Sequence, residues 1–324
     1  MTKLDVAGLA AAAVAERRRR LGVPVAVAVV ALLAVAPLVL APFATTTLTR
    51  MLAFALFVAS LDLLVGMTGL PSLGHAAYFG TGAYAAGWVA LHVTAEIPVP
   101  LVAGAVTGAL AAAVTGWVTL RSHGVFFLVL TLATGEMAHQ LAHTLEPVTG
   151  GANGLTGIPA ARVAGVSLRG PGETYWYVLA GCALGFAVLW LVVRGPFGTA
   201  LRGIRDNEPR MRALGYPTAL YKYVVFVVAG GVAGAAGALL VAQQRLVTPG
   251  DLGFTTASLA LLAVVIGGAG SLWGACLGAV LVVAVRDAFG PALGGHGTLV
   301  LGVMFVLVVY SSGFRRARFR GARR

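Results

Sequence analysis

The chain has 324 residues, of which 59% are hydrophobic and 10% are charged, and its mean hydropathy is +0.90. A soluble domain is about 45–50% apolar and about 25% charged, so the composition excludes an ordinary soluble fold and indicates a polytopic membrane protein. The net charge of +12 gathers at 17–20, 194–222 and 315–324. These basic clusters flank apolar segments, so membrane topology explains them more simply than nucleic-acid binding does.

Apolar segments long enough to cross a bilayer of about 30 Å follow one another along the chain. The expected spans lie at 22–43, 48–68, 74–94, 99–120, 125–145, 174–193 and 223–242, then at 254–288 and 297–313. The stretch 254–288 is too long for one crossing, and the glycine-rich 267–271 at its centre is a natural break. We therefore predict an all-α transmembrane helix bundle of about ten spans with broken or re-entrant helices.

Charge and small residues indicate how this bundle is arranged. A basic N-terminal segment over 1–21 is followed by a transmembrane domain over 22–314 and a basic tail over 315–324, with both termini in the cytoplasm. Alternation of the spans also puts the interior loop 194–222 in the cytoplasm. Glycine pairs spaced four residues apart, at 104 and 108 and at 230 and 234, predict close helix packing.

The interior loop predicts two short helices. In the first, apolar residues at helical spacing share one face: Phe197, Ala200, Leu201 and Ile204. The second begins with Asn207 as its N-cap and Glu208 in its first turn, and it ends at Gly215. A helix of about two turns is unstable alone in water. We therefore expect the loop to dock on a partner through an exposed face that includes Arg205, Glu208 and Arg212.

Asp62 and Glu136 are ionisable residues that lie inside the second and the fifth predicted span. Each would cost about 2.5–3.5 kcal/mol at the centre of an isolated helix in lipid, so each is expected to face the bundle interior or an aqueous cavity. Two interpretations stay open for both residues. They make interhelical hydrogen bonds, or they line a pathway for a polar solute.

Two glycine-interrupted segments, 69–82 and 267–278, each contain Ser-Leu followed shortly by glycine. Broken helices in the two halves of a transporter offer backbone groups to a polar solute, so Ser72, His75 and Ser271 are further candidate pathway residues. Tight packing of bent helices explains the same glycines. His75 is then a packing and hydrogen-bonding residue.

Nucleotide and metal chemistry find little support in the sequence. A P-loop needs Gly-Lys-Ser/Thr, whereas the lysines here are Lys3 and Lys222, so ATP-driven work would use a separate ATPase. Glu136, His139 and His143 share a helix face, but the HExxH core of a zinc enzyme is missing. We expect no metal and no cofactor. A membrane-embedded metalloenzyme built around Glu136, His139 and His143 stays open as an alternative function.

Four segments resemble one known family, in the same order along the chain. They are 69–84 (GLPSLGHAAYFGTGAY), 149–159 (TGGANGLTGIP), 197–215 (FGTALRGIRDNEPRMRALG) and 265–274 (VIGGAGSLWG). The first is similar to the SLGHAAFFGIGAY stretch of LivM-type permeases from branched-chain amino acid ABC importers. Together the segments spread the resemblance over nearly the whole chain beyond the first span.

The resemblance implies a transport subunit of the bacterial cell membrane that catalyses no reaction itself. Such a permease forms half of a pathway with a second, LivH-like permease, and it works with two ATP-binding subunits and an extracytoplasmic solute-binding protein. The loop corresponds to the EAA-type coupling loop, with Glu208 and Gly215 in matching places, although their spacing is one residue longer than the general pattern. At Asp62 asparagine would be usual.

Two other functions stay open beside this resemblance. One is an autonomous channel or ion-coupled secondary transporter, which would move its solute without ATPase subunits. The other is an importer permease for urea or short amides, since such importers have similar permeases.

Overall fold

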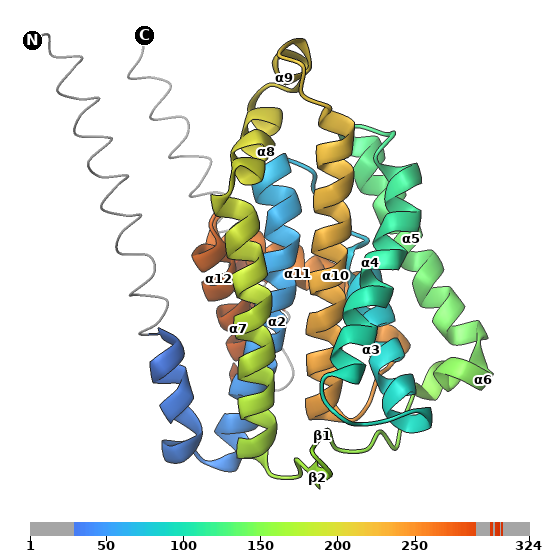
Figure 1. Cartoon of the computed structure of the whole chain (residues 1–324), viewed down its shortest axis with the longest axis vertical. Coiled ribbons are helices and arrows are strands. Elements are labelled where there is room, and N and C mark those ends of the chain that lie inside the picture. The colour runs from blue at the N-terminus through green and yellow to red at the C-terminus, as the bar shows by residue number, and fades with distance from the viewer. Residues whose placement is uncertain (1–28, 290–298, 301, 305, 307–324) are drawn as a thin grey trace, which may run out of the picture.

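The computed structural model describes residues 29–289, 299–300, 302–304 and 306. The N-terminal segment 1–21, the tail 315–324 and most of the expected span 297–313 lie outside the described residues. The described part is a bundle of long helices that stand side by side (Figure 1). An all-helical bundle is confirmed, apart from a small hairpin of β1 (Arg162–Val163) and β2 (Val166–Ser167).

Long helices are joined by short helical turns. The long ones are α2 (Pro42–Thr68), α3 (His75–His92), α4 (Val99–Thr119), α5 (Val125–Thr144), α7 (Pro171–Arg194), α10 (Thr218–Gln244), α11 (Phe254–Gly267) and α12 (Leu272–Ala284), and a shorter apolar helix, Val29–Val39, precedes them. The short ones are α6 (Glu146–Thr149), η1 (Gly151–Asn153), α8 (Pro196–Asp206), α9 (Glu208–Ala213), η2 (Pro249–Asp251) and the π-helical η3 (Val285–Phe289).

Within the described residues, six helices are long and apolar enough to cross a membrane. They are α2, α4, α5, α7, α10 and the segment Pro249–Gly267, which contains η2 and α11. The chain is therefore a multi-pass helical membrane protein. The number ten stays a prediction, because α3 and α12 are shorter or less apolar and part of the chain lies outside the described residues.

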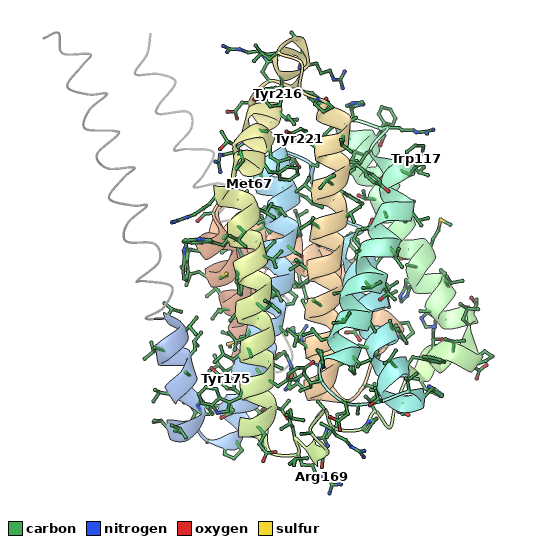
Figure 2. All side chains as sticks on the ribbon, in the orientation of Figure 1. Met67, Trp117, Arg169, Tyr175, Tyr216 and Tyr221 are labelled. Carbon is green, nitrogen blue, oxygen red and sulfur yellow. The ribbon has the colours of Figure 1, made fainter. Side chains whose placement is uncertain are left out.

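The bundle has two distinct ends (Figures 1 and 2). The α9 end carries α8 and α9, and Met67, Tyr216 and Tyr221 lie near it. The β end carries β1 and β2, and Arg169 and Tyr175 lie near it. Because α10 starts beside α9 and runs to Gln244, η2 lies toward the β end.

α10 occupies the centre of the bundle and packs on α2, α3, α4 and α7. Gly82 of α3, Gly104 of α4 and Gly234 of α10 meet so closely that a Cβ at Gly234 would overlap the carbonyl oxygen of Gly104. Gly108 and Gly230 make a second close crossing between α4 and α10. The predicted glycine packing is confirmed. In lipid, where burial from water drives no helix association, such close backbone contact holds helices together.

α11 and α12 form a hairpin that turns back at 267–271, where the sequence predicts a break. At the turn Gly268 and Gly270 have φ angles of +89° and +92°, a left-handed conformation that glycine adopts without strain. Gly270 bonds to Asp62 toward the α9 end of α2, and Asp287 after α12 pairs with Arg50 toward its β end. The hairpin therefore starts and finishes toward the β end.

Substitution at the glycine junction tests this packing. Gly234→Ala should lower the apparent melting temperature of the detergent-solubilised protein by several degrees, because the added methyl overlaps the Gly104 backbone and overpacking costs about 1–3 kcal/mol. Gly231→Ala is the matched control, since its methyl would lie 3.3 Å from the Ala109 Cβ. Equal shifts in the two variants would show that the junction does not limit stability.

Candidate functional site

The interior loop forms the α9 end, and α8 fixes it to the bundle. The apolar face of α8 is buried, as predicted: Ala200, Leu201 and Ile204. Phe197 is partly buried and stacks on Tyr221 of α10, with ring centroids 5.1 Å apart. α8 also contacts α2 and α7, so it packs against three long helices.

α9 begins and ends where the sequence predicts. The side chain of Asn207 accepts a hydrogen bond from the Arg210 N–H at 3.0 Å, which caps the helix N-terminus. Gly215 after the helix has a φ of +88°, which a β-branched residue adopts only with strain. α9 is six residues long, so its position depends on contacts with its neighbours.

Glu208 supplies those contacts. Its Oε1 accepts from Arg212 Nη2 at 2.7 Å, from Lys222 Nζ at 2.8 Å and from Thr218 Oγ1 at 3.2 Å. Lys222 belongs to α10, and its side chain is only 7% exposed. We call Glu208, Arg212, Thr218 and Lys222 the Glu208 clamp, because they hold α9 against the start of α10.

The position of the Glu208 side chain differs from the one that the sequence predicts. The spacing predicts Glu208 on the exposed face of α9, whereas the structure turns its carboxylate inward, with 22% of the side chain exposed. Lys222 and Thr218 are partners that the sequence pattern did not identify. The available signal was Lys222 itself, because the chain has only two lysines, Lys3 and Lys222.

The clamp keeps Glu208 ionised. Burial by itself raises the pKa of this carboxyl, but the hydrogen bond and charge of Lys222, with the bonds from Arg212 and Thr218, outweigh burial and bring the pKa below its ordinary 4.5. Because the folded pKa lies below the unfolded one, the clamp contributes its full stability above pH 4.5. That stability is lost as the pH falls through the lowered pKa.

Arg205 connects α8 to the interior of the bundle. Its aliphatic stem lies over Gly69, where α2 ends, and its Nη1 donates to the carbonyl oxygen of Gly66. Asp62, one turn earlier on α2, accepts at Oδ1 from the Gly270 N–H at 2.7 Å. We call Asp62, Gly66, Arg205 and Gly270 the Arg205 junction. It joins the loop, the end of α2 and the turn of the α11–α12 hairpin.

Asp62 is fully buried, and its hydrogen bond lies between helices, so the geometry agrees with the first of the two interpretations. Gly66 has no room for a side chain here, because a Cβ would overlap both the Asp62 carboxylate and the Gly270 nitrogen. The second carboxylate oxygen, Oδ2, has no hydrogen-bond partner within the described chain. An asparagine can present the same acceptor to Gly270, so this bond does not require a charge.

His75 lies at the start of α3, deep in the bundle. Ser60 Oγ donates to the Phe57 carbonyl at 2.6 Å, so it accepts from His75 Nε2 at 2.9 Å. The imidazole stacks on Phe57 and meets Tyr78 edge-on. His75 is thus a packing and hydrogen-bonding residue in this conformation.

The two serine candidates occupy different environments. Ser72 is fully buried, and its hydroxyl has no partner among the residues that the structure describes. Ser271 lies beside the Arg205 junction, where its Oγ accepts from the Gly274 N–H at 3.2 Å and caps α12. Of the five pathway candidates, Asp62 and Ser271 are brought to the same turn.

Glu136 is separate from this site, on the exposed face of α5. Its Oε1 accepts from Gln140 Nε2 at 3.2 Å. His139 contacts the Pro249 carbonyl through Nδ1 at 2.8 Å, and His143 lies edge-on to the His139 ring. No group of three or more His, Cys, Asp or Glu side chains suited to a metal occurs in the described part of the chain. The metalloenzyme hypothesis therefore has no geometric support there.

The Glu208 clamp can be tested by limited proteolysis. Glu208→Gln should speed trypsin cleavage after Arg210 severalfold at neutral pH, because a neutral amide cannot compensate Lys222 and α9 loosens. Lys222→Met should act in the same direction. Asp206→Asn is the control, since among the residues that the structure describes this exposed carboxylate pairs only with the adjacent Arg205, at 3.4 Å. The clamp is refuted if Glu208→Gln and Asp206→Asn are cleaved alike.

Hydrogen exchange tests the Asp62–Gly270 bond. Asp62→Leu should increase amide exchange in the peptide 267–271 about tenfold or more, because the Gly270 N–H loses a charge-assisted bond. Asp62→Asn keeps an acceptor and should change exchange by less. A result in which Leu and Asn protect the turn equally would remove Asp62 from the junction.

Comparison with known proteins identifies the family. A family model described as "Branched-chain amino acid transport system / permease component" matches residues 43–309. The high-affinity branched-chain amino acid transport system permease proteins LivM of Salmonella typhimurium and Escherichia coli are 29% and 27% identical over 272 residues, which cover 77% of this chain. The chain spans 64% of the length of these relatives.

Among solved structures, PsaBC from Streptococcus pneumoniae in complex with Fab is 16% identical, with 84% of this chain and 90% of that chain covered. Its TM-score of 0.42 is too low to assign a fold. The family match, in contrast, extends over most of the chain and includes α2 to α12 with both the Glu208 clamp and the Arg205 junction. This chain belongs to the family of permease components of branched-chain amino acid transport systems.

Proposed function

We propose that this protein is the transmembrane subunit of an ATP-driven importer in a bacterial cell membrane. It forms half of the pathway with a second, LivH-like permease, while two ATP-binding subunits hydrolyse ATP in the cytoplasm. An extracytoplasmic binding protein delivers branched-chain amino acids or a related small polar solute. Membership of a transport family and the names of the two LivM relatives support this proposal.

The Arg205 junction is the observation that carries the proposal. A subunit driven by a separate ATPase needs a rigid connection between its docking surface and its spans. Arg205 makes that connection, because it extends from the loop helix α8 to the end of α2 and lies beside Gly270 of the hairpin turn. Movement of α8 is thereby passed to two interior elements at once.

The Glu208 clamp is a second connection between the loop and the spans. Since Glu208 bonds to Lys222 and Thr218, displacement of α9 pulls on the start of α10, the central helix of the bundle. Glu208, Arg212 and Gly215 act in this proposal by keeping α9 in place. The ATP-binding subunit meets the exposed tip instead, which includes Arg210, Leu214 and Leu220, with 65% of Leu214 exposed.

The same proposal orients the bundle. The α9 end faces the cytoplasm and the β end faces the binding protein, so ten membrane segments leave both termini in the cytoplasm. The α11–α12 hairpin supplies two of the ten segments. Glu136 supports a pathway or a permease partner beside α5, because an exposed carboxylate within a span avoids lipid. Ser72 and Ser271 lie in the two broken segments and complete the proposed lining of the pathway, whereas His75 packs inside the bundle.

Uptake by the assembled complex tests the function. Proteoliposomes with both permeases, both ATP-binding subunits and the binding protein should take up leucine only with ATP. Arg205→Gln should lower uptake about tenfold, the loss expected for one charge-assisted hydrogen bond, while the ATP-binding subunits still co-purify. Arg202→Gln is the control, because within the described residues Arg202 bonds only to Val193 and Thr199 at the α7–α8 corner.

Two results would contradict the proposal. Uptake that persists without the ATP-binding subunits would favour an autonomous channel or ion-coupled transporter. Equal uptake in Arg205→Gln and Arg202→Gln would remove the Arg205 junction from coupling.

A further inference from the structure

The outer faces of the peripheral helices differ in polarity. α4 has no charged residue, and α7 carries charge only at its two ends, at Glu173 and Arg194. Away from the bundle both helices expose mainly aliphatic side chains: Val102, Val106, Leu110 and Val114 on α4, and Ala180, Leu184, Val188 and Leu191 on α7. Such faces suit contact with lipid chains.

α5 differs, because its exposed face contains a carboxylate and an amide, Glu136 and Gln140. Glu136 lies about 17 Å along the helix from Val125, at 1.5 Å per residue, and therefore near the middle of this 20-residue span. Its Oε1 accepts from Gln140 Nε2 at 3.2 Å, and no described residue donates to its Oε2. One acceptor of a charged group is thus open on the outside of the bundle, at membrane depth.

The opposite face of α5 fixes the orientation of the helix. That face is buried and consists of Phe127, Thr131, Gly135 and Ala142. Thr131 Oγ1 accepts from the Leu73 N–H at 3.2 Å, and a Cβ at Gly135 would lie 3.1 Å from the Gly74 Cα. α5 is therefore anchored on the residues just before α3, and it presents Glu136 outward at the edge of the bundle (Figure 1).

This outer face of α5 can meet lipid, water or protein. Lipid is unfavourable, because an ionised carboxylate in hydrocarbon is costly. Water is unfavourable too, because Val129, Met137 and Leu141 are 56%, 71% and 56% exposed on the same side as Glu136 and Gln140, and apolar surface gains from leaving water. Protein suits both kinds of side chain, since polar groups hydrogen-bond between membrane helices and methionine adapts to the shape of a partner.

The carboxylate also indicates which kind of protein covers the face. A second copy of this chain would pack through a two-fold axis along the membrane normal. That axis would bring two Glu136 carboxylates together at the same depth, where like charges repel. A different chain can offer a hydrogen-bond donor instead, such as an amide, a hydroxyl or a cationic group. Ala133, which is exposed one turn before Met137, leaves room for its close approach.

We propose that the exposed face of α5 is the contact surface for a membrane helix of the second permease. The contact surface consists of Val129, Ala133, Glu136, Met137 and Gln140, and the partner helix presents a hydrogen-bond donor to Oε2 of Glu136. The inference rests on the proposed function for the existence of a second permease. It names the helix and the side chain through which the two chains meet, and it leaves the outer faces of α4 and α7 to lipid.

Photo-crosslinking in the purified complex of both permeases in nanodiscs tests the contact surface. p-Benzoylphenylalanine in place of Met137 should form a covalent product with the second permease on irradiation, which mass spectrometry of the joined peptides identifies. The same group in place of Leu110 or Leu184, which are 59% and 63% exposed, should react with lipid only. No protein product at Met137, a product between two copies of this chain, or equal yields at all three positions would overturn the proposal.

Two exposed alanines provide a steric test. Ala133→Trp should lower the amount of the second permease that co-purifies at least about tenfold, because the indole prevents close helix approach. Ala180→Trp, at an exposed position of α7, is the matched control and should leave the recovery unchanged. The melting temperature of the chain purified alone should be the same in both variants, which separates loss of the partner from loss of the fold. Equal recovery of the second permease in the two variants would contradict the proposal.

The carboxylate is tested separately. Glu136→Leu should lower recovery of the second permease about tenfold, the loss expected for one charge-assisted hydrogen bond. The melting temperature of the chain alone should not fall, since leucine suits an exposed position in a span. Glu136→Gln keeps an acceptor and should retain most of the recovery. Wild-type recovery with Glu136→Leu would show that Glu136 has no donor in the partner and would overturn its part in the proposal.

These outcomes are separate from those of the proposed function. Formation of the complex requires no ATP, so the contact surface stands even if uptake proves independent of the ATP-binding subunits. Conversely, ATP-dependent uptake by a complex that neither crosslinks at Met137 nor weakens with Ala133→Trp would refute the contact surface alone. A wild-type chain that does not bind the second permease would overturn both.

Discussion

The Arg205 junction is the constraint on which the described bundle depends most directly. A guanidinium from the loop, a carbonyl at the end of α2, and a buried carboxylate bound to the Gly270 amide meet within one helical turn. Each of these groups would be costly in an apolar interior without a partner. Their pairing therefore fixes the loop, α2 and the hairpin turn relative to one another.

Glycine makes this arrangement possible in the middle of the bundle. Where Gly82, Gly104 and Gly234 meet, helix backbones approach more closely than any side chain allows. The same holds at the junction, where Gly66 leaves room for the hairpin turn. Helices that pack through their backbones transmit a displacement to one another, because no flexible side chain lies between them to absorb it.

Charged side chains gather at both ends of the bundle. At the α9 end, Glu208 neutralises a nearly buried lysine and stabilises a helix too short to stand alone. Toward the β end, Arg50, Asp251 and Arg286 line a pocket, and Asp287 pairs with both arginines. The first group holds α9 against α10, and the second joins α2 to the residues that follow α12.

The sequence by itself determined the membrane class, most helix positions, the two-helix loop with Asn207 and Gly215 at the ends of α9, and the break at 267–271. These follow from local chemistry: hydrophobic runs, caps and glycine conformations act over a few residues. Only the tertiary structure decided that Glu208 turns inward to Lys222, that Arg205 meets Gly66, and that Arg50 and Asp251 share a cavity. Arg50 and Asp287 bond across 237 positions of sequence, and helical periodicity carries no information about which helices become neighbours.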